Sequence, residues 1–374
     1  MNKLLVLLMV LSFPGFVLGQ THVDLQVVGT FPSSCMETSG LETSTNGRLW
    51  SINDSGNQPE LFQIDSHANL ISILTVNGAT NVDWEDLARS DDGRFFVGDF
   101  GNNGNARTNL CIYILPNPDL VSGTGIDTLG VIHFAYPDQT AFPPATEEMN
   151  FDCESMFWWN GNLYLVSKNR GTSQYAKLYQ LPDHPGTFVP TLLDSFNTGY
   201  WITGADINPT GDRLFLQSYQ GFWVFDEIQN ASFFQGIPYQ FQTNTTQRES
   251  VVFSSNSHLY MSDEYQIINQ SGGKLYSLSI DSLIDYVSLT PFPNNPLKVR
   301  FDQQTNEVIV NLTTIKSTEF PLKLQLITES GQLVYSREFS KTLDFFKIPV
   351  AGPGVFILDI ASPKHRFRKK IVAN

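Results

Sequence analysis

Apolar and polar residues alternate in short runs along most of the chain, and turn-forming residues separate these runs. Five segments share one order: a strand that carries acidic residues, a tight turn, and a strand of large apolar residues that ends in polar ones. They are SGLETSTNGRLWSIND, DWEDLARSDDGRFFVGD, DCESMFWWNGNLYLVSK, GADINPTGDRLFLQSY and RESVVFSSNSHLYMSDE. The turns contain Gly, Asn, Asp or Ser, which tolerate the backbone angles of tight hairpins. The pattern predicts five β-hairpins of one design.

Each predicted hairpin is followed by a third apolar strand, and four of the five by a fourth. The third strands are ELFQID, CIYIL, AKLYQL, GFWVFD and GKLYSLSI, and the fourth strands are LISILTV, GVIHFAY, TLLDSF and IPYQFQ. The fifth unit lacks an obvious fourth strand, whereas the segment DLQVVGTF at 24–31 stands unpaired ahead of the first unit. If that segment completes the fifth unit, the two ends of the domain close a ring without exposed sheet edges.

A repeat of about 50 residues with four strands is typical of β-propeller blades. We therefore predict an all-β chain with a five-bladed β-propeller followed by a small C-terminal β-sandwich. Six blades are the alternative, because the third repeat starts late, after the connection PDQTAFPPATEEM. A single β-sandwich is disfavoured, since the strands of a sandwich do not repeat a four-strand pattern five times. The predicted boundaries are a signal peptide at 1–19, the propeller at 20–288 and the C-terminal domain at 289–374.

Acidic residues recur near the start of the first strand of these units. The start of a first strand and the end of the second lie at the same end of an antiparallel blade, and inner strands line the axis of a propeller. The predicted metal ligands in the first strands are Glu85, Glu154, Asp206 and Glu249. In the first repeat the counterpart is Glu37 or Glu42, with Ser39 at the strict register. The second-strand ends supply the predicted ligand-binding residues Asn53, Asp54, Asp99, Lys168 and Asp263. We expect these groups to converge at one mouth of the channel.

Carboxylates that share a narrow opening repel one another, which raises some pKa values or recruits a cation. Oxygen ligands suit Ca²⁺ or Mg²⁺, and Ca²⁺ is the predicted cofactor. Zinc is disfavoured, because the six His are scattered and no paired Cys occur. For DSGN or DFGNNGN alone, side-chain bonds to the turn backbone are the favoured interpretation. For the ring of first-strand acids, a functional binding site is the favoured interpretation, since acids on inner strands are costly to bury without a partner.

The beginning of the chain and its charge predict an exported protein. A basic start at Lys3, an apolar run and small residues before a cut after Gly19 have the layout of a secretory signal peptide. No later segment is apolar enough to cross a bilayer. The net charge of −14 argues against nucleic acid as a partner. Cys35, Cys111 and Cys153 form no disulfide framework, and buried free thiols are expected.

The pattern changes near residue 290, where alternating strands with turns at ESG and AGPG predict a small antiparallel sandwich. This module resembles the C-terminal sorting domains of the Bacteroidetes type IX secretion system. The matching elements are Pro293, Asn294 and Pro296 at its start, a turn at Gly331, the segment GPGVFILDI from Gly352, and the basic finish RKKIV. The start departs from the family pattern, with PNNP where Pro-Asn-Pro is common. The resemblance implies passage through the periplasm and outer membrane, and release or anchoring at the cell surface.

Several segments together resemble a family of secreted bacterial propellers of poorly defined function. They are SGLE, LWSINDSGN, VDWEDLA, VGDFGNN with the following Arg107, DCES and LYLVSKNRG. That family is similar to the esterase-like phytase and lactonase-like propellers, and the resemblance spans about residues 37–180. It implies the propeller architecture.

Two functions follow from these observations. The first is an exported propeller that binds a divalent cation and an extracellular ligand at the axial mouth. The second is a Ca²⁺-assisted hydrolase of a phosphoester, ester or lactone, in which Glu85 or Glu154 activates water. A glycosidase, which requires two carboxylates about 5–9 Å apart, is a weaker third. No Gly-x-Ser-x-Gly elbow, phosphate-binding loop or dinucleotide fingerprint occurs.

Overall fold

A computed structural model describes two compact units, one of which is the propeller at Thr21–Ser288 and the other of which begins at Leu289. The described residues are 21–268, 270–280, 283, 290–291, 298–303, 305–312, 321–328, 333–340, 345–350, 352–362 and 365–373. The predicted signal peptide at 1–19 lies outside them, as do the PNNP start of the C-terminal module, Gly331 and Lys364.

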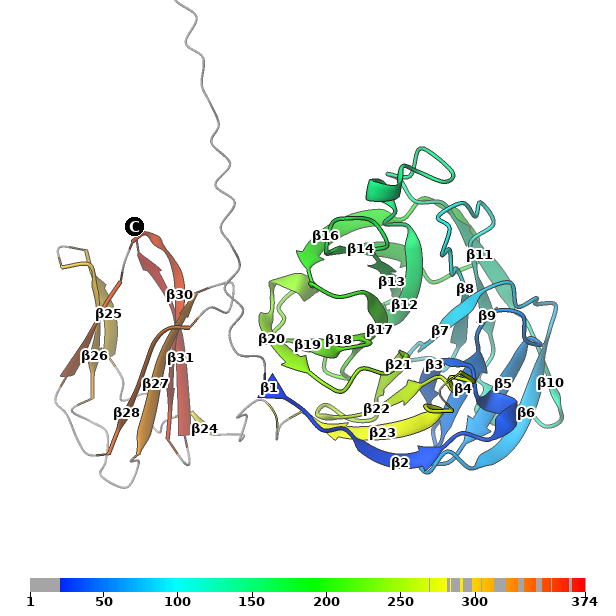
Figure 1. The fold of residues 1–374 in the computed structure, drawn as a ribbon, viewed down its shortest axis with the longest axis horizontal. Helices are drawn as coiled ribbons and strands as arrows, with labels where there is room; N and C mark the ends of the chain where they lie inside the picture. The colour runs from blue at the N-terminus through cyan, green and yellow to red at the C-terminus, as the bar shows by residue number, and fades with distance from the viewer. Residues whose placement is uncertain are drawn as a thin grey trace, which may run out of the picture. The chain divides into compact units, whose positions relative to one another are not determined.

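The first unit consists of five blades arranged around an axis (Figure 1), which confirms the five-bladed prediction. The four strands of the first blade, from the axis outward, are β3 (Thr38–Thr43), β4 (Leu49–Asn53), β5 (Glu60–Ile64) and β6 (Leu70–Asn77). Those of the second are β7 (Trp84–Arg89), β8 (Phe95–Asp99), β9 (Cys111–Leu115) and β11 (Gly130–Phe134). Those of the third are β12 (Asp152–Trp159), β13 (Asn162–Lys168), β14 (Tyr175–Pro182) and β16 (Thr191–Asn197). Those of the fourth are β17 (Ile202–Ile207), β18 (Arg213–Ser218), β19 (Gly221–Asp226) and β20 (Ile237–Gln242).

The fifth blade is built from both ends of the propeller sequence. Its inner three strands are β21 (Arg248–Phe253), β22 (His258–Asp263) and β23 (Lys274–Ser279). Its outer strand is β2 (Gln26–Thr30), which pairs antiparallel with β23, as the blue and yellow ribbons of Figure 1 show. The unpaired segment at the start of the sequence therefore closes the ring, as predicted. The inner strands β3, β7, β12, β17 and β21 contact one another in this cyclic order.

Three blades carry a fifth strand that the sequence pattern did not indicate. β10 (Gly125–Asp127), β15 (Gly186–Phe188) and β1 (Thr21–His22) each pair in parallel with the outer strand of a neighbouring blade. These strands are two or three residues long, which is too short for alternation to reveal them. Four short 3₁₀ turns complete the unit: η1 (Ser33–Cys35), η2 (Pro118–Leu120), η3 (Thr146–Glu148) and η4 (Phe233–Gln235).

Apolar side chains are buried between blades. Five separate clusters each draw residues from two neighbouring blades, and the cluster that joins the last blade to the first includes Phe31, Leu41 and Leu275. The three cysteines are buried free thiols, as expected. Each blade is therefore stabilised by both neighbours, which makes closure of the ring a condition for burying every cluster.

The second unit is a two-sheet β-sandwich around one apolar core, as predicted. One sheet contains β24 (Thr290–Pro291), β31 (His365–Ala373), β30 (Gly354–Ala361), β27 (Leu322–Thr328) and β28 (Leu333–Phe339), and the other contains β25 (Lys298–Asp302), β26 (Glu307–Asn311) and β29 (Phe345–Pro349). Within the described parts of both units, no helical segment has the length and apolarity that a membrane crossing needs.

Ring closure predicts a specific sensitivity at Gly29 of β2. A Cβ atom on Gly29 would lie 2.1 Å from the carbonyl oxygen of His67 in the first blade. We expect Gly29→Ala to lower the free energy of unfolding by about 1–3 kcal/mol, because backbone must move to relieve the clash. Gly104→Ala is the matched control, since a Cβ there meets no atom within 4 Å. Equal urea-unfolding curves for the two variants would contradict this account of closure.

Candidate functional site

Each inner strand contains a β-bulge near its start, where one residue has no partner on the second strand. The bulged residues are Ser39, Glu85, Glu154, Thr203 and Glu249. Because the inner strands surround the axis, these five residues form a ring at one end of the channel. The end of the channel where the inner strands begin is called the mouth below. Glu85, Glu154 and Glu249 thus occupy the matched positions that the sequence predicted, and Ser39 fills the position in the first blade.

Asp206 does not belong to this ring, and its predicted place there is wrong. The bulged residue of the fourth blade is Thr203, three residues earlier, and Asp206 pairs with Phe215 further along β17. Its carboxylate accepts hydrogen bonds from the backbone N–H groups of Ile207 (2.8 Å) and Phe253 (2.7 Å). Thr203 instead donates a hydrogen bond of 2.6 Å to the carbonyl of Arg248, which joins two blades at the mouth.

Three of the predicted ligand-binding residues are held by the protein itself. Asn53 donates to the carbonyl of Ser34 at 2.9 Å. Asp99 pairs with Arg107 at 2.8 Å and accepts from the backbone of residues 82 and 83. Asp263 accepts from the Tyr276 hydroxyl at 2.6 Å and from the Lys274 N–H at 2.7 Å. Asp99 and Asp263 are therefore occupied by donors from other segments, whereas the buried Oδ1 atom of Asn53 has no partner among the described residues.

Lys168 lies at the centre of a buried polar group. Its Nζ atom is 3.0 Å from Glu154 Oε2 and 3.2 Å from the Tyr219 hydroxyl, which donates to Glu249 Oε1 at 2.8 Å. The side chains of Lys168 and Glu154 are only 3% and 4% exposed, so this is an ion pair inside the protein. Burial lowers the pKa of Lys168, but Glu154 and Glu249 outweigh burial and raise it. Lys168 therefore stays charged.

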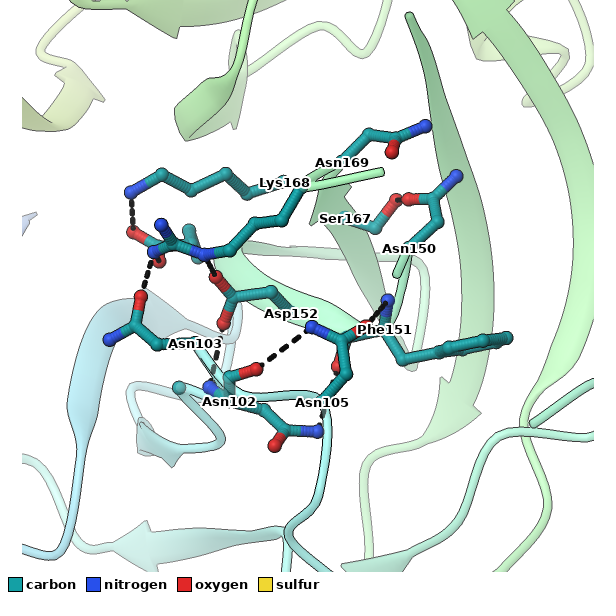
Figure 2. A network of polar contacts seen from close by, with 12 residues as sticks. Asn102, Asn103, Asn105, Asn150, Phe151, Asp152, Ser167, Lys168 and Asn169 are labelled. Atoms are coloured by element: carbon teal, nitrogen blue, oxygen red, sulfur yellow. Dashed lines mark hydrogen bonds and ion pairs between the residues drawn. The ribbon is translucent and has the colours of Figure 1, made fainter. Parts of the chain in front are cut away.

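The loop after β8 locks the second blade to the third at the mouth (Figure 2). Asp152 accepts a hydrogen bond from the backbone N–H of Asn102 at 2.6 Å, and Asn105 accepts one from the N–H of Phe151 at 2.7 Å. Arg170 forms an ion pair with Asp152 and lies 3.3 Å from Glu154 Oε1. The DFGNNGN segment is thus mainly a structural loop, and it places Arg170 at the edge of the mouth.

Asp54, Asp83 and Glu85 form a second group beside Lys168. Their carboxylates each have an oxygen within 4.8 Å of the others. Asp54 follows the second strand of the first blade, whereas Asp83 and Glu85 flank the start of β7. Among the described residues, the carboxylates of Asp83 and Glu85 accept no hydrogen bond and form no ion pair, in contrast to Asp99, Asp152 and Glu154. We call these three residues the carboxylate trio.

The backbone of Gly101 lies against the trio. A Cβ atom at this position would be 2.1 Å from Glu85 Oε1 and 2.5 Å from Asp83 Oδ2. Any side chain there would occupy the space in which the two carboxylates meet. The absence of a side chain at Gly101 is therefore what allows Asp83 and Glu85 to face one another.

The electrostatics of the mouth follow from burial and from like charges. Burial raises the pKa of Glu85 well above its ordinary value, and Glu154, Asp54 and Asp83 raise it further. Burial, then Asp54, raises the pKa of Asp83 to about 6. Glu264, which follows the second strand of the fifth blade, has its pKa raised to about 9 by burial and by Glu249. A divalent cation among the trio would reverse these shifts, because it stabilises the ionised carboxylates.

Sequence reasoning missed several residues of the mouth, although it offered Glu37 as one of two counterparts in the first repeat. Five residues precede a bulged residue by two positions: Glu37, Asp83, Asp152, Trp201 and Gln247. Glu37, Asp152 and Gln247 stand opposite residues at the ends of the second strands, which are Asp54, Lys168 and Glu264. The carbonyl of Asp83 accepts a hydrogen bond from the Gly101 N–H. The signal was present in the repeat, since an acid occurs two residues before Glu85 and before Glu154.

No family model and no curated protein matches the sequence. Several solved propeller structures are similar in fold. A PQQ-bound aldose sugar dehydrogenase from Streptomyces coelicolor is 10% identical over 68% of this chain and 96% of its own, with a TM-score of 0.43. A gluconolactonase from Xanthomonas campestris is 14% identical over 65% of this chain and 72% of its own, with a TM-score of 0.36.

An extracellular domain assigned to a one-component system of B. thetaiotaomicron is 9% identical over 93% of this chain and 58% of its own, with a TM-score of 0.30. At these identities and TM-scores the likeness assigns no activity and no site residue. The function therefore has to be argued from the mouth itself.

The buried Lys168–Glu154 pair predicts a large cost for losing one partner. Lys168→Met removes the nearer and more buried of the two cationic partners of Glu154 and leaves only Arg170, at 3.3 Å, so we expect the free energy of unfolding to fall by about 3 kcal/mol or more. Lys177→Met is the matched control, because the Lys177–Asp138 pair lies closer to solvent, and about 1 kcal/mol or less is expected there. Urea unfolding of both variants tests this, and equal losses would show that Lys168 is not the charge that holds Glu154.

Proposed function

We propose that this protein is an exported propeller that binds Ca²⁺ through the carboxylate trio and, with it, an oxygen-rich anionic ligand outside the cell. The observation that carries the proposal is the convergence of Asp54, Asp83 and Glu85, none of which forms an ion pair with a described residue. Three other acids at the mouth have a cationic partner: Asp99 pairs with Arg107, Asp152 with Arg170, and Glu154 with Lys168. A cation is the missing element that would let all three trio carboxylates ionise together.

The donor set fits Ca²⁺ better than a transition metal. All three groups offer carboxylate oxygen, which suits hard cations that take six to eight oxygen ligands. Asp54 and Asp83 are only partly buried, whereas Glu85 is buried. A cation held by these residues would thus keep positions open toward solvent, where oxygen atoms of a ligand complete its coordination.

The neighbouring cations support an anionic ligand. Lys168 acts electrostatically on Asp54 of the trio. Arg170 pairs with Asp152 and Glu154 at the mouth, and its guanidinium stacks over the ring of Trp201 at 5.5 Å. Trp201 is 46% exposed, so this stacked pair forms part of the rim. Arginine presents a planar fork of donors that matches carboxylate or phosphate groups. A ligand that carries such a group would contact the cation with one oxygen and Arg170 with another.

A Ca²⁺-assisted hydrolase is the second candidate, and one observation favours it. Glu249 Oε2 is buried and has no hydrogen-bond partner, next to a tyrosine hydroxyl and Lys168. A buried carboxylate with a raised pKa is suited to proton transfer. In this version the cation would polarise an ester, lactone or phosphoester, and Glu249 or Glu154 would accept a proton from water.

Activity screens separate the two candidates. Turnover of ester, lactone or phosphoester substrates that is lost on addition of EDTA and in Glu249→Gln, with folding intact, would establish the hydrolase. If no substrate is turned over and the protein binds Ca²⁺, the first candidate, a binding protein without catalytic activity, is supported.

The delivery route is part of the proposal. The resemblance of residues 289–374 to type IX sorting domains supports export through the outer membrane in a host with that system. We expect deletion of residues 290–374 to retain the protein in the periplasm, as measured by fractionation and immunoblotting. Unchanged delivery to the surface or medium would refute this route without affecting the site.

Ca²⁺ binding is tested by calorimetric titration of the full chain. We expect wild type to bind Ca²⁺ and to gain about 2.7 kcal/mol of stability at a hundredfold excess over Kd. Gly101→Ala should weaken binding at least about tenfold, because the new Cβ displaces Glu85 and Asp83. Gly104→Ala, in the same loop but with open space around it, should bind as wild type does. Asp83→Asn should weaken binding similarly, and wild-type affinity in both site variants would refute the trio as the cation site.

A further inference from the structure

A pocket of about 270 Å³ lies where the inner strands end, at the opposite end of the channel from the mouth. Its lining comes from all five blades: Glu42 and Thr43, Arg89–Asp91, Trp158 and Trp159, Asp206–Pro209, and Phe253. Because every inner strand contributes to it, the pocket lies on the axis of the propeller. It shares no lining residue with the carboxylate trio or with the Lys168 group.

Two carboxyl groups enter this pocket from matching positions. Glu42 and Asp206 each lie three residues beyond the bulge of their strand, whereas the other three blades carry Ala88, Phe157 and Val252 at that position. Glu42 Oε1 accepts from the N–H and hydroxyl of Thr43, and its Oε2 has no partner among the described residues. The pocket therefore presents two acids on an otherwise apolar ring.

Aromatic rings line the pocket on both faces of β12, because Trp158 packs toward the second blade and Trp159 toward the fourth. Trp158 is held by a hydrogen bond of 2.8 Å from its indole N–H to Asp183. The indole of Trp159 lies against the backbone of Gly211, where a Cβ atom would come within 2.0 Å of the ring. Both indoles are partly exposed, and Phe253 completes the wall. The rings are thus fixed in place and accessible from the pocket.

The charges of the lining leave an excess of negative groups. Arg89 is the one cationic side chain in it, and its guanidinium donates to the carbonyl of Thr43 at 3.3 Å. Glu42, Asp206 and the exposed Asp91 are acidic, and β12 and β21 contribute only aromatic groups. Asp86 lies deeper, and its carboxylate accepts from the N–H groups of Leu87 and Met156.

We propose that this pocket is a second ligand site, independent of the mouth, that takes a small organic cation with an ammonium group. The ammonium donates to the carboxylates of Glu42 and Asp206, and its alkyl part lies against the indole of Trp159, which borders the blade of Asp206. Carboxylates combined with aromatic faces are the usual chemistry for holding such cations. A neutral ligand would leave the two acids facing one another in a partly desolvated space.

The acid pair makes this binding dependent on pH. Burial raises the pKa of Glu42 to about 7, and burial together with Glu42 raises that of Asp206. A cationic ligand binds the ionised carboxylates, so affinity rises with pH as these groups lose their protons. A neutral hydroxylated ligand would lack this dependence. The sign of the pH effect therefore distinguishes the two classes of ligand.

The test uses the full chain and n-butylammonium as the probe, with n-butanol as its neutral analogue, in ligand-observed NMR titrations. An alkylammonium stays charged at both about pH 8 and about pH 5.5, as a lysine side chain does. We expect n-butylammonium to bind at least about tenfold more tightly at the higher pH, and n-butanol to show no such gain.

Variants locate the binding. Glu42→Gln keeps an oxygen for the Thr43 N–H, and it should weaken binding of n-butylammonium about tenfold or more. Asp206→Asn should have a similar effect, and Asp91→Asn, on the exposed edge, should change affinity less than about twofold. Asp83→Asn, at the mouth, should leave it unchanged. Absence of millimolar binding in wild type, equal binding of n-butanol, or wild-type affinity in folded Glu42→Gln would overturn the proposal.

Discussion

Closure of the ring is the constraint from which both ends of the channel follow. The last blade is completed by β2 from the start of the chain, so the five inner strands are fixed around one axis. Each inner strand bulges near its start, and the bulged residue has no partner on the second strand. The bulged side chains have to find polar partners around the mouth. Ser39 and Thr203 do so by donating to carbonyl groups of the next blade, as short hydroxyl side chains can. The glutamates at the same positions reach further, and their charge decides the chemistry of the mouth.

Buried carboxylates are stable only when something favours their ionised form. At the mouth this requirement is met to different degrees. Lys168 neutralises Glu154, and backbone N–H groups and Arg107 hold Asp99. Among the described residues, the carboxylate trio receives only one backbone N–H, from Ser55 to Asp54, and no ion pair. An isolated acid could solve the same problem by taking a proton. Three acids whose oxygens lie within 4.8 Å of one another, with glycine backbone pressed against them, gain more from one shared cation. The surroundings of the trio therefore indicate a cation site better than the number of acids at the mouth does.

The sequence predicted the strands, the turns, the blade count and the closing strand, because apolar alternation and turn residues are local signals. It also identified Glu85, Glu154 and Glu249 as matched residues. It misplaced Asp206, because the acid of the fourth repeat was matched to the other acids by residue type and not by its position in the strand. The bulge that sets this position adds one residue to a strand without changing the apolar pattern around it. Asp83 was missed because it lies just before β7, where the alternation of apolar and polar residues does not indicate which way a side chain points. Whether an acid has a partner depends on residues from other blades, which no local pattern contains.

The two ends of the channel use the same inner strands for opposite purposes. Toward the start of each strand the bulge turns polar groups to the axis, and toward its end the ordinary pleat brings Glu42 and Asp206 there beside aromatic rings. Asp86, between the two ends, and Asp206, at the pocket, each accept a hydrogen bond from the backbone of the next blade, which fixes the spacing of the strands. The carboxylates of the mouth and those of the pocket share no hydrogen-bond partner among the described residues. Changes at the two ends should therefore add in their effects on stability, as expected for sites that are not in contact. A propeller of this kind can acquire or lose chemistry at one end while the other end and the ring remain as they are.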